Sequence, residues 1–395
     1  METHGNMTKR PDFLTIAILL FLLTSLVSIS TSQVFLGLAF LILIVLLAKK
    51  QIRFLFPPFF WGGVAYCGLS LVSSLLSVNP EVSLYESRKL LLFLIIPIVY
   101  TGLRKSADIL RANKALLTSA FISIGFSLGY GLLKAAPGER IQGFMGHYMT
   151  QAGVLLLFSA LALSKLVFSR KKTRWFWGLA FLSSLVVLIL TSTRSAWIGM
   201  IIAAVVVLIF YKPKTLIVVP AAVLLVLAVS PREVKQRAAS IFSLSSYSNA
   251  QRIEYIRTGL HIIEEHPFFG TGPDTVDMVF QHPKYRLSKE AKRNVHLHNN
   301  IIQIAAERGI PALIVWLAFL AWAFSSLCRL LSNRDPLLFP LTVAAVAAFS
   351  AHFAAGLFEY NFADSEVAAV FFYIITVPFA QAKILSKRPR PAEES

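Results

Sequence analysis

The sequence predicts an all-α polytopic membrane protein of about twelve transmembrane helices. Of its 395 residues, 56% are hydrophobic and 15% are charged, and the mean hydropathy is +0.67. Soluble domains carry about 25% charged residues. The apolar runs are continuous and about 16–22 residues long, as a helix needs to cross a hydrocarbon core of about 30 Å. Because β-barrel strands would show short alternating segments, helices are the expected spanning elements.

Apolar runs separated by charged or Pro/Gly-marked breaks define the twelve predicted spans. These spans lie near residues 13–30, 34–48, 55–77, 88–103, 115–133, 149–168, 175–191, 195–211, 215–230, 310–330, 336–358 and 366–383. Lys9 and Arg10 precede the first run as in a secretory signal, but no small-residue cleavage site follows, so a retained helix is expected. Cys67 and Cys328 lie in apolar segments and indicate no disulfide or metal framework.

Basic residues in the short connections favour an orientation with both termini in the cytoplasm. In this orientation the short segments on the cytoplasmic side hold 21 basic residues. The short outer loops hold only Arg88, Lys89, Lys134, Arg140 and Arg194. The net charge of +18 is then mainly a topogenic signal and an attraction for anionic membrane lipids. Since no basic cluster lies on a soluble domain, no nucleic-acid partner is expected.

The spans and their connections divide the chain into four predicted parts. These are helices one to nine over 1–229, a large outer loop over 230–309, helices ten to twelve over 310–385, and a cytoplasmic tail over 386–395. The outer loop contains a predicted helix over Asn249–His266, with Ile253, Ile256, Leu260 and Ile263 on one face. A second helix is expected from near His298 toward Pro311. The loop is therefore predicted to be a folded helical cap.

Two arginines are candidate anion-binding residues. Arg194 lies between two apolar runs, so it is either an interfacial arginine beside the aromatic Trp197 or a functional charge at the membrane surface. Arg252 lies near the start of the predicted loop helix, close to Tyr255. The helix macrodipole opposes a cation there, and a nearby anion would relieve that opposition. The alternative for Arg252 is a solvated surface arginine.

Histidines and carboxylates supply the remaining candidates. His296 and His298 are two residues apart, but a third ligand with metal-like spacing is missing and the chain has no Asp-x-Asp pair, so no metal site is predicted. His298 is a candidate general base, because histidine titrates near neutral pH; the alternative is a polar surface histidine. Weaker signals come from His147 in an outer loop, and from an acidic cluster at the outer end of the last hairpin. That cluster consists of Glu359, Asp364 and Glu366.

In this order and topology, these segments resemble the O-antigen ligase family of bacterial envelope biogenesis, within a group that includes O-antigen polymerases and O-linked oligosaccharyltransferases. In topology the resemblance covers nearly the whole chain: twelve helices, cytoplasmic termini and a large periplasmic loop before the tenth helix. Four short stretches carry it in motif: Thr-Arg-Ser-Ala-Trp at 193–197, Ser248-x-x-x-Arg252, Gly270-Thr271-Gly272-Pro273, and His298-Asn299 followed by Glu307-x-Gly309. Read alone, the glycine stretch is a tight turn, too short for a nucleotide-binding fingerprint.

The resemblance implies transfer of a glycan from undecaprenyl diphosphate to a sugar hydroxyl of lipid A–core, without a metal or other cofactor. It places the active site on the periplasmic face of the bacterial inner membrane. Arg194 and Arg252 would bind the diphosphate, and His298 would deprotonate the acceptor with inversion at the sugar. Supporting roles fall to His296, Asn299, Trp197, Tyr255, His147, Glu359 and Asp364. The expected partners are the lipid-linked donor, the lipid A–core acceptor and membrane lipids; the oligomeric state is left open.

Two alternatives compete with the ligase interpretation. A polymerase of the same group would share the twelve-helix plan and the arginine-bearing loop, and the His-Asn stretch favours the ligase over it. A lipid-linked glycan transporter would need internal repeats, interrupted helices and polar residues near the midplane. The sequence shows no convincing repeat, and its polar candidates gather at the outer face. The ligase is therefore the preferred prediction.

Overall fold

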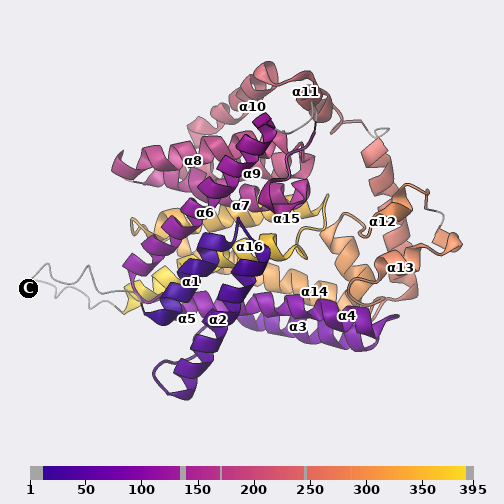
Figure 1. Cartoon of the computed structure of the whole chain (residues 1–395), viewed down its shortest axis with the longest axis horizontal. Coiled ribbons are helices and arrows are strands. Elements are labelled where there is room, and N and C mark those ends of the chain that lie inside the picture. The colour runs from indigo at the N-terminus through magenta and orange to yellow at the C-terminus, as the bar shows by residue number, and fades with distance from the viewer. Residues whose placement is uncertain (1–11, 134–138, 170, 244–246, 286, 388–395) are drawn as a thin grey trace, which may run out of the picture.

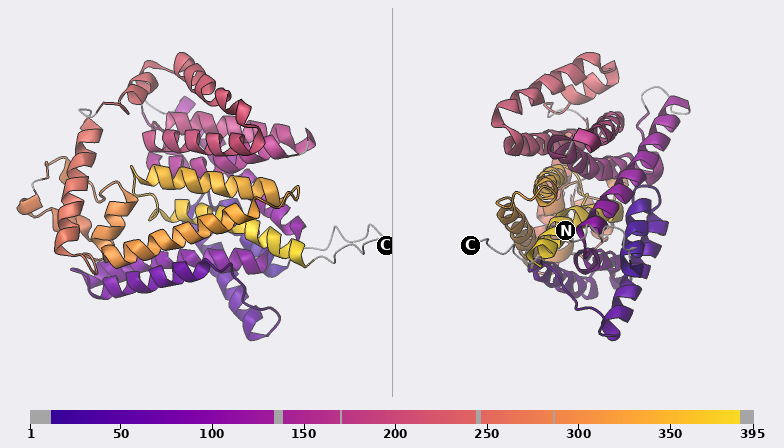
Figure 2. Two further views of the ribbon diagram at one scale, coloured as in Figure 1. Left: turned by 180° about the vertical axis from the view of Figure 1, so that it is seen from behind. Right: turned by 90° about the vertical axis from the view of Figure 1, so that its left-hand side faces the viewer.

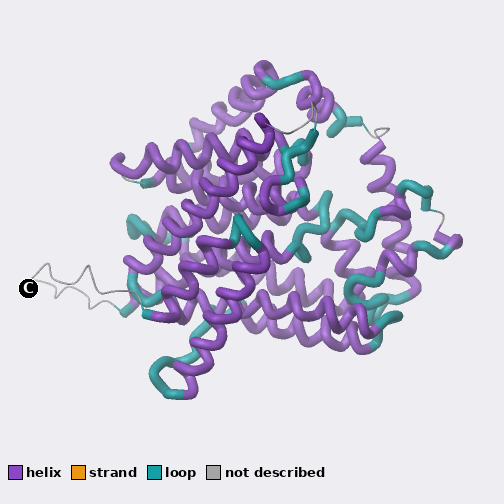
Figure 3. Tube along the Cα trace, viewed as in Figure 1, coloured by secondary structure: helices purple, strands orange, loops and turns teal. Residues whose placement is uncertain are grey.

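The all-α class is confirmed by a computed structural model that describes residues 12–133, 139–169, 171–243, 247–285 and 287–387. Every regular element in those ranges is a helix (Figure 3). Lys9 and Arg10, used to orient the N-terminus, lie outside the described residues, as do Lys134, Arg170 and the tail from residue 388.

The elements run in order from α1 at the start of the described chain to α16 at its end (Figure 1). The first group is α1 (Phe13–Thr24), α2 (Ile29–Ala48), α3 (Phe60–Leu75), α4 (Pro80–Glu86), η1 (Ser87–Leu94), α5 (Ile95–Gly102), α6 (Ser106–Leu133), η2 (Gly143–Met145), α7 (Tyr148–Phe168), α8 (Lys171–Leu190) and α9 (Arg194–Tyr211). The second group is η3 (Pro213–Ile217), α10 (Val218–Val229), α11 (Arg232–Ala239), α12 (Tyr247–Glu265), α13 (Val276–Phe280), η4 (Pro283–Tyr285), η5 (Ala291–Arg293), α14 (Asn300–Leu330), α15 (Leu338–Gly356) and α16 (Ser365–Ser386).

Seven helices in the described chain are long and apolar enough to cross a membrane: α2, α7, α8, α9, α14, α15 and α16. They account for seven of the twelve predicted spans. The other five predicted spans coincide with α1, α3, η1 followed by α5, α6, and η3 followed by α10. The multi-pass prediction is thus confirmed, and the exact count of twelve stays a prediction.

The centre of the bundle is formed by α7, α15 and α16. In each of these helices 83% of the most apolar stretch is buried, compared with 17% in α2 at the periphery. Small residues allow α15 to pack closely on α9: a Cβ added at Gly199 would lie 2.9 Å from the carbonyl oxygen of Ala351. Close packing of small residues is typical of helices in lipid, where the hydrophobic effect does not drive helices together.

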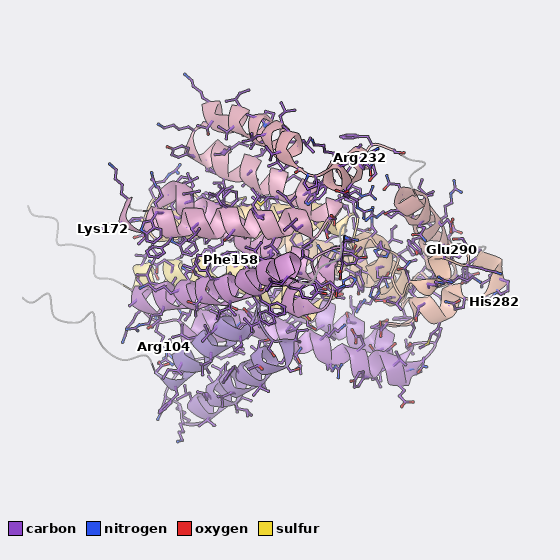
Figure 4. All side chains as sticks on the ribbon, turned by 45° about the horizontal axis from the view of Figure 1, so that its top comes forward. Arg104, Phe158, Lys172, Arg232, His282 and Glu290 are labelled. Atoms are coloured by element: carbon purple, nitrogen blue, oxygen red, sulfur yellow. The ribbon has the colours of Figure 1, made fainter. Side chains whose placement is uncertain are left out.

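The two ends of the bundle carry different elements. Arg104 and Lys172 lie at one end, and Arg232, His282 and Glu290 of the 230–309 segment lie at the other (Figure 4). At this second end α12 runs across the direction of the long helices (Figures 1 and 2). The short basic connections and the long loop are therefore segregated, as the orientation argument requires. Which side of a membrane each end faces stays a prediction.

The helix predicted over Asn249–His266 is confirmed as α12. It packs on the start of α14 and on a small core, whose buried side chains are Tyr255, Ile262, Val276, Phe280, Tyr285, Leu287, Ala291, Leu297 and Ala306. Of the apolar stripe read from the sequence, Ile263 packs against this core, whereas Ile253, Ile256 and Leu260 are 37–48% exposed. The spacing thus identified the helix, and the residues between the stripe positions form most of its packed face.

The second predicted loop helix and the span predicted over 310–330 form one bent helix, α14. The bend is at Gly309, whose φ of 82° and ψ of 166° suit glycine, just before Pro311. The glycine turn packs into this bend: the Thr271 N–H donates to the Ala306 carbonyl at 2.9 Å, and the Gly272 N–H donates to the Glu307 carbonyl at 2.8 Å. The turn thus fastens the outer segment to the top of α14.

Candidate active site

Arg194 begins α9, and its side chain is 5% exposed. One guanidinium nitrogen donates to the Ser240 carbonyl at 2.8 Å, and another donates to Ser248 Oγ at 2.9 Å and Asn249 Oδ1 at 2.8 Å. Arg194 therefore joins the membrane bundle to the end of α11 and the start of α12. Trp197 donates to the Leu188 carbonyl at 3.2 Å, which secures the α8–α9 turn.

Two further arginines, which the sequence did not single out, lie against the same turn. Arg140 donates to the carbonyls of Thr191 at 2.8 Å and Ser192 at 3.1 Å, and Arg237 donates to the Ser192 carbonyl at 3.2 Å. Carbonyls at a helix C-terminus attract cations, which explains why both arginines settle beyond α8. The rarity of basic residues in the short outer loops was a signal for Arg140, but no local pattern pointed to Arg237.

Arg252 completes a cluster of four arginines, hereafter the arginine cluster: Arg140, Arg194, Arg237 and Arg252. Burial lowers the pKa of Arg252, Glu359 opposes that shift, and Arg237 adds to it. Burial also lowers the pKa of Arg140 to about 10; Tyr148 and Glu359 oppose the shift, and Arg237 and Arg194 reinforce it. Within the described chain, the carboxylate that acts on both of these arginines is Glu359. The cluster therefore carries more positive than negative charge.

His298 lies beside this cluster and pairs with Glu359. Its Nδ1 is 3.0 Å from Glu359 Oε1, and the Tyr255 ring lies 5.4 Å from the imidazole. Burial alone would raise the pKa of Glu359, but His298, Arg252 and the Tyr360 backbone N–H together hold it below its usual value. Glu359 is thus a buried, ionised carboxylate that can fix the orientation of an imidazole.

The two asparagines after His298 explain its position. Asn299 caps α14 by accepting from the Ile301 and Ile302 N–H groups, and it donates to the Leu357 carbonyl at 2.9 Å. Asn300 donates to Asn361 Oδ1 at 2.8 Å. His298 itself has a positive φ of 51°. These bonds reach Leu357 and Asn361, on either side of Glu359 in the chain, and hold the histidine against the connection between α15 and α16.

His296 and His147 lie near the His298–Glu359 pair. The His296 ring lies 5.2 Å from the Tyr360 ring, and burial lowers its pKa, which favours the neutral form. His147 stacks on Tyr148 with centroids 4.6 Å apart. Burial also lowers the pKa of His147, and Glu359 opposes that shift.

The remaining candidate residues have contacts that suit supporting roles. Tyr255 is buried and donates to the Ala291 carbonyl at 3.1 Å. Asp364 accepts from Thr150 Oγ1 at 3.1 Å, and burial together with Glu366 and Glu359 raises its pKa to about 7. Across the described ranges, no group of three or more His, Cys, Asp or Glu side chains is placed to hold a metal ion. The site thus combines excess guanidinium charge with a carboxylate-oriented histidine.

Residues 179–317 match the family model described as O-Antigen ligase. The match supports membership of the O-antigen ligase family. Among curated proteins, no match to the chain was found. Family members are membrane glycosyltransferase-like enzymes, and the family suggests activity of the O-antigen ligase or polymerase type. The matched stretch includes Arg194, Arg252 and His298, whereas Arg140 and Glu359 lie outside it and are joined to the site by the fold.

Proposed function

We propose that the protein is an O-antigen ligase. It transfers a glycan from undecaprenyl diphosphate to a sugar hydroxyl of lipid A–core at the periplasmic face of the bacterial inner membrane, with inversion and without a metal. One observation carries the proposal: the charge-excess arginine cluster and the His298–Glu359 pair share a carboxylate, because Glu359 acts electrostatically on Arg252 and Arg140 and lies 3.0 Å from His298 Nδ1. The first suits a diphosphate leaving group, and the second suits deprotonation of a hydroxyl.

The arginine cluster stabilises the departing diphosphate. As the bond between the anomeric carbon and the phosphate oxygen breaks, its electron pair passes to the diphosphate. Charge-assisted hydrogen bonds to that charge contribute about 1.5–3 kcal/mol each. Arg252 reaches Asn249 only at 3.5 Å, so most of its five N–H donors stay available for a phosphate within the described site. Arg194 bonds to Ser240, Ser248 and Asn249, and so positions the start of α12, the helix that carries Arg252.

His298 removes the acceptor proton. Glu359 accepts from Nδ1, which leaves Nε2 as the basic nitrogen, the same division of roles as in a carboxylate–histidine pair of a hydrolase. The hydroxyl proton moves to Nε2 while the acceptor oxygen bonds to the anomeric carbon from the side opposite the diphosphate, so the configuration inverts. General-base catalysis of this kind contributes about 10²–10⁴-fold. The product histidine is a cation that Glu359 stabilises.

The proposal is tested with purified protein in liposomes, supplied with lipid-linked donor and lipid A–core in the presence of EDTA. We expect wild type and the exposed-histidine control His282→Ala to form glycosylated lipid A–core. His298→Ala should lose about 10²–10⁴-fold in rate. If the glycan of the donor is lengthened but no glycosylated lipid A–core forms, the protein is a polymerase rather than a ligase. Absence of any transfer, with both substrates shown competent in a parallel reaction, would refute both enzymes.

A further inference from the structure

Two adjacent phenylalanines just after α12 have side chains that the fold leaves exposed. Phe268 is 69% exposed and Phe269 is 45% exposed. Together with Pro267 they form the connection between α12 and the glycine turn, hereafter the phenylalanine turn. The proposed mechanism uses neither ring. Large apolar side chains that gather at a surface mark a contact with a partner or with a membrane.

The phenylalanine turn is tied to two helices of the bundle. The Ile310 N–H donates to the Pro267 carbonyl at 2.8 Å, which joins the turn to α14. Ser73 Oγ donates to the Phe269 carbonyl at 2.7 Å, which joins it to α3. The backbone of the turn is therefore fixed, and the exposure of the two rings belongs to the fold rather than to a loose loop.

The turn lies at the height where α14 reaches the edge of a bilayer. After its bend at Gly309, α14 runs to Leu330, and at about 1.5 Å per residue this part is about 30 Å long. The hydrocarbon core of a bilayer is also about 30 Å thick. Arg329 is exposed at the far end of this part, where a long basic side chain can reach the headgroups. Ile310, which is bonded to the turn, therefore marks the opposite boundary of the hydrocarbon.

The surface of α14 next to the turn is one that lipid covers. Ile310 is 40% exposed and Ile314 is 60% exposed, and residues four apart lie on the same face of a helix. The phenylalanine turn adjoins this face through the hydrogen bond between Ile310 and Pro267. Lipid that covers the two isoleucines therefore reaches the turn. A soluble protein partner would have to occupy a surface beside which lipid already lies.

The chemistry of the turn fits the boundary between headgroups and acyl chains. Phenylalanine is one of the residues that interfacial segments insert about 5–10 Å into this boundary. Irregular backbone is not tolerated in the hydrocarbon core itself, because unpaired N–H and C=O groups are costly there. The carbonyls of Pro267 and Phe269 are both paired, which lowers the cost of bringing this turn close to lipid.

We propose that the phenylalanine turn is a membrane anchor. Phe268 and Phe269 insert between bulk phospholipids, at the hydrocarbon boundary of the leaflet at this end of the bundle. Because Arg194 bonds to Ser248 and Asn249, α12 is held by the bundle at its start and by lipid at its end. The inference is independent of the proposed function, since it concerns how the 230–309 segment is held and not what it catalyses.

Nitroxide spin labels measure the depth of the turn. In a Cys67→Ala/Cys328→Ala background, single cysteines replace Phe268, the exposed Ile314 of α14, and Glu290, an exposed residue at the same end of the bundle (Figure 4). The proteins are reconstituted in phosphatidylethanolamine–phosphatidylglycerol vesicles. Collisions with oxygen, which partitions into lipid, are compared with collisions with a water-soluble nickel chelate. We expect the oxygen-to-nickel ratio of Phe268→Cys to be several-fold above that of Glu290→Cys and close to that of Ile314→Cys.

Two results would overturn the anchor. A ratio for Phe268→Cys equal to that for Glu290→Cys would place the turn in water. Low collision with both reagents would show that a protein chain covers the turn instead of lipid. If the label at Phe268 lowers the melting temperature in detergent, Phe269→Cys serves as the reporter, with the same expected ratio and the same contradicting results.

A second measurement tests whether the anchor holds the end of α12. Hydrogen exchange is followed in lipid nanodiscs for Phe268→Ser/Phe269→Ser and for the control Phe242→Ser, which removes a 90% exposed phenylalanine of the same segment. We expect amides in the last turn of α12 to exchange several-fold faster in the double variant only, because local opening becomes easier. Unchanged exchange, or equal acceleration in the control, would contradict the holding role. Neither measurement needs a substrate, so failure of the ligase proposal would leave both results interpretable.

Discussion

Two buried polar clusters lie around the adjacent residues Glu359 and Tyr360, and they differ in their balance of positive and negative charge. Around Tyr360, Glu307 accepts from Gln303 at 2.7 Å, from the Asp274 N–H at 3.1 Å and from Tyr360 at 3.2 Å, and it also pairs with Arg308. Here one buried cation faces one buried carboxylate. Around Glu359, several guanidinium groups share a single described carboxylate. A balanced buried cluster joins elements of the fold, whereas an unbalanced one is prepared for an anion.

Arg252→Gln should have the largest effect on the unbalanced cluster. Loss of charge-assisted bonds to the diphosphate is expected to lower the transfer rate by about 10²–10⁴-fold. Folding should not suffer, because the change relieves repulsion with Arg237. Transfer rate and detergent melting temperature measure the two effects. Arg257→Gln, at an exposed position of the same helix, is the control. An equal loss of rate in that variant would show that the effect does not come from the arginine cluster.

Arg308→Met should have the opposite effect to Arg252→Gln, with its main loss in stability rather than in transfer rate. It leaves Glu307 as an unpaired buried charge, which typically costs about 3–5 kcal/mol of stability. The free energy of unfolding in denaturant, followed by circular dichroism, measures this. If Arg308→Met abolished transfer without lowering stability, the balanced cluster would be part of the chemistry, and the two clusters would no longer differ in kind.

Glu359→Gln tests whether the carboxylate of the unbalanced cluster positions His298. Glutamine keeps the volume but cannot stabilise an imidazolium, so kcat should fall by about 10²-fold, the low end of what a general base contributes. Because the pKa of Glu359 lies below its usual value, wild type keeps this carboxylate ionised at mildly acid pH. Any loss of wild-type rate at acid pH that comes from protonation of Glu359 should therefore be absent in the variant, which has no carboxylate at this position. An unchanged profile with a uniformly reduced rate would indicate only a structural role.

Asp364→Asn should give the smallest effect, and it concerns stability. The pKa of Asp364 is raised to about 7, so the folded state retains a proton that the unfolded chain loses near pH 4. Stability of wild type therefore falls as pH rises from about 4 to 7, and asparagine should remove that part of the fall. Melting temperatures of both proteins at pH 5 and pH 7.5 test this; parallel curves would contradict it.

The sequence predicted the helices well because lipid requires long apolar runs, and it found Arg194, Arg252 and His298 because they lie in short recognisable stretches. It did not identify Arg140 or Arg237, whose roles depend on carbonyls 45 to 52 positions away in the chain. The pairing of His298 with Glu359 spans 61 positions and was equally hidden. The exposed stripe of α12 shows the same limit, since periodicity defines a face but not what covers it.

The connection between α15 and α16 has a consequence for biosynthesis. Glu359 belongs to the last helical hairpin, so His298 gains its partner only after the ribosome has completed that hairpin and the insertion machinery has released it. A nascent chain with its arginines already in place would hold an unoriented base. Under the proposed function, the order of synthesis therefore prevents glycan transfer until the last hairpin has folded and oriented the base.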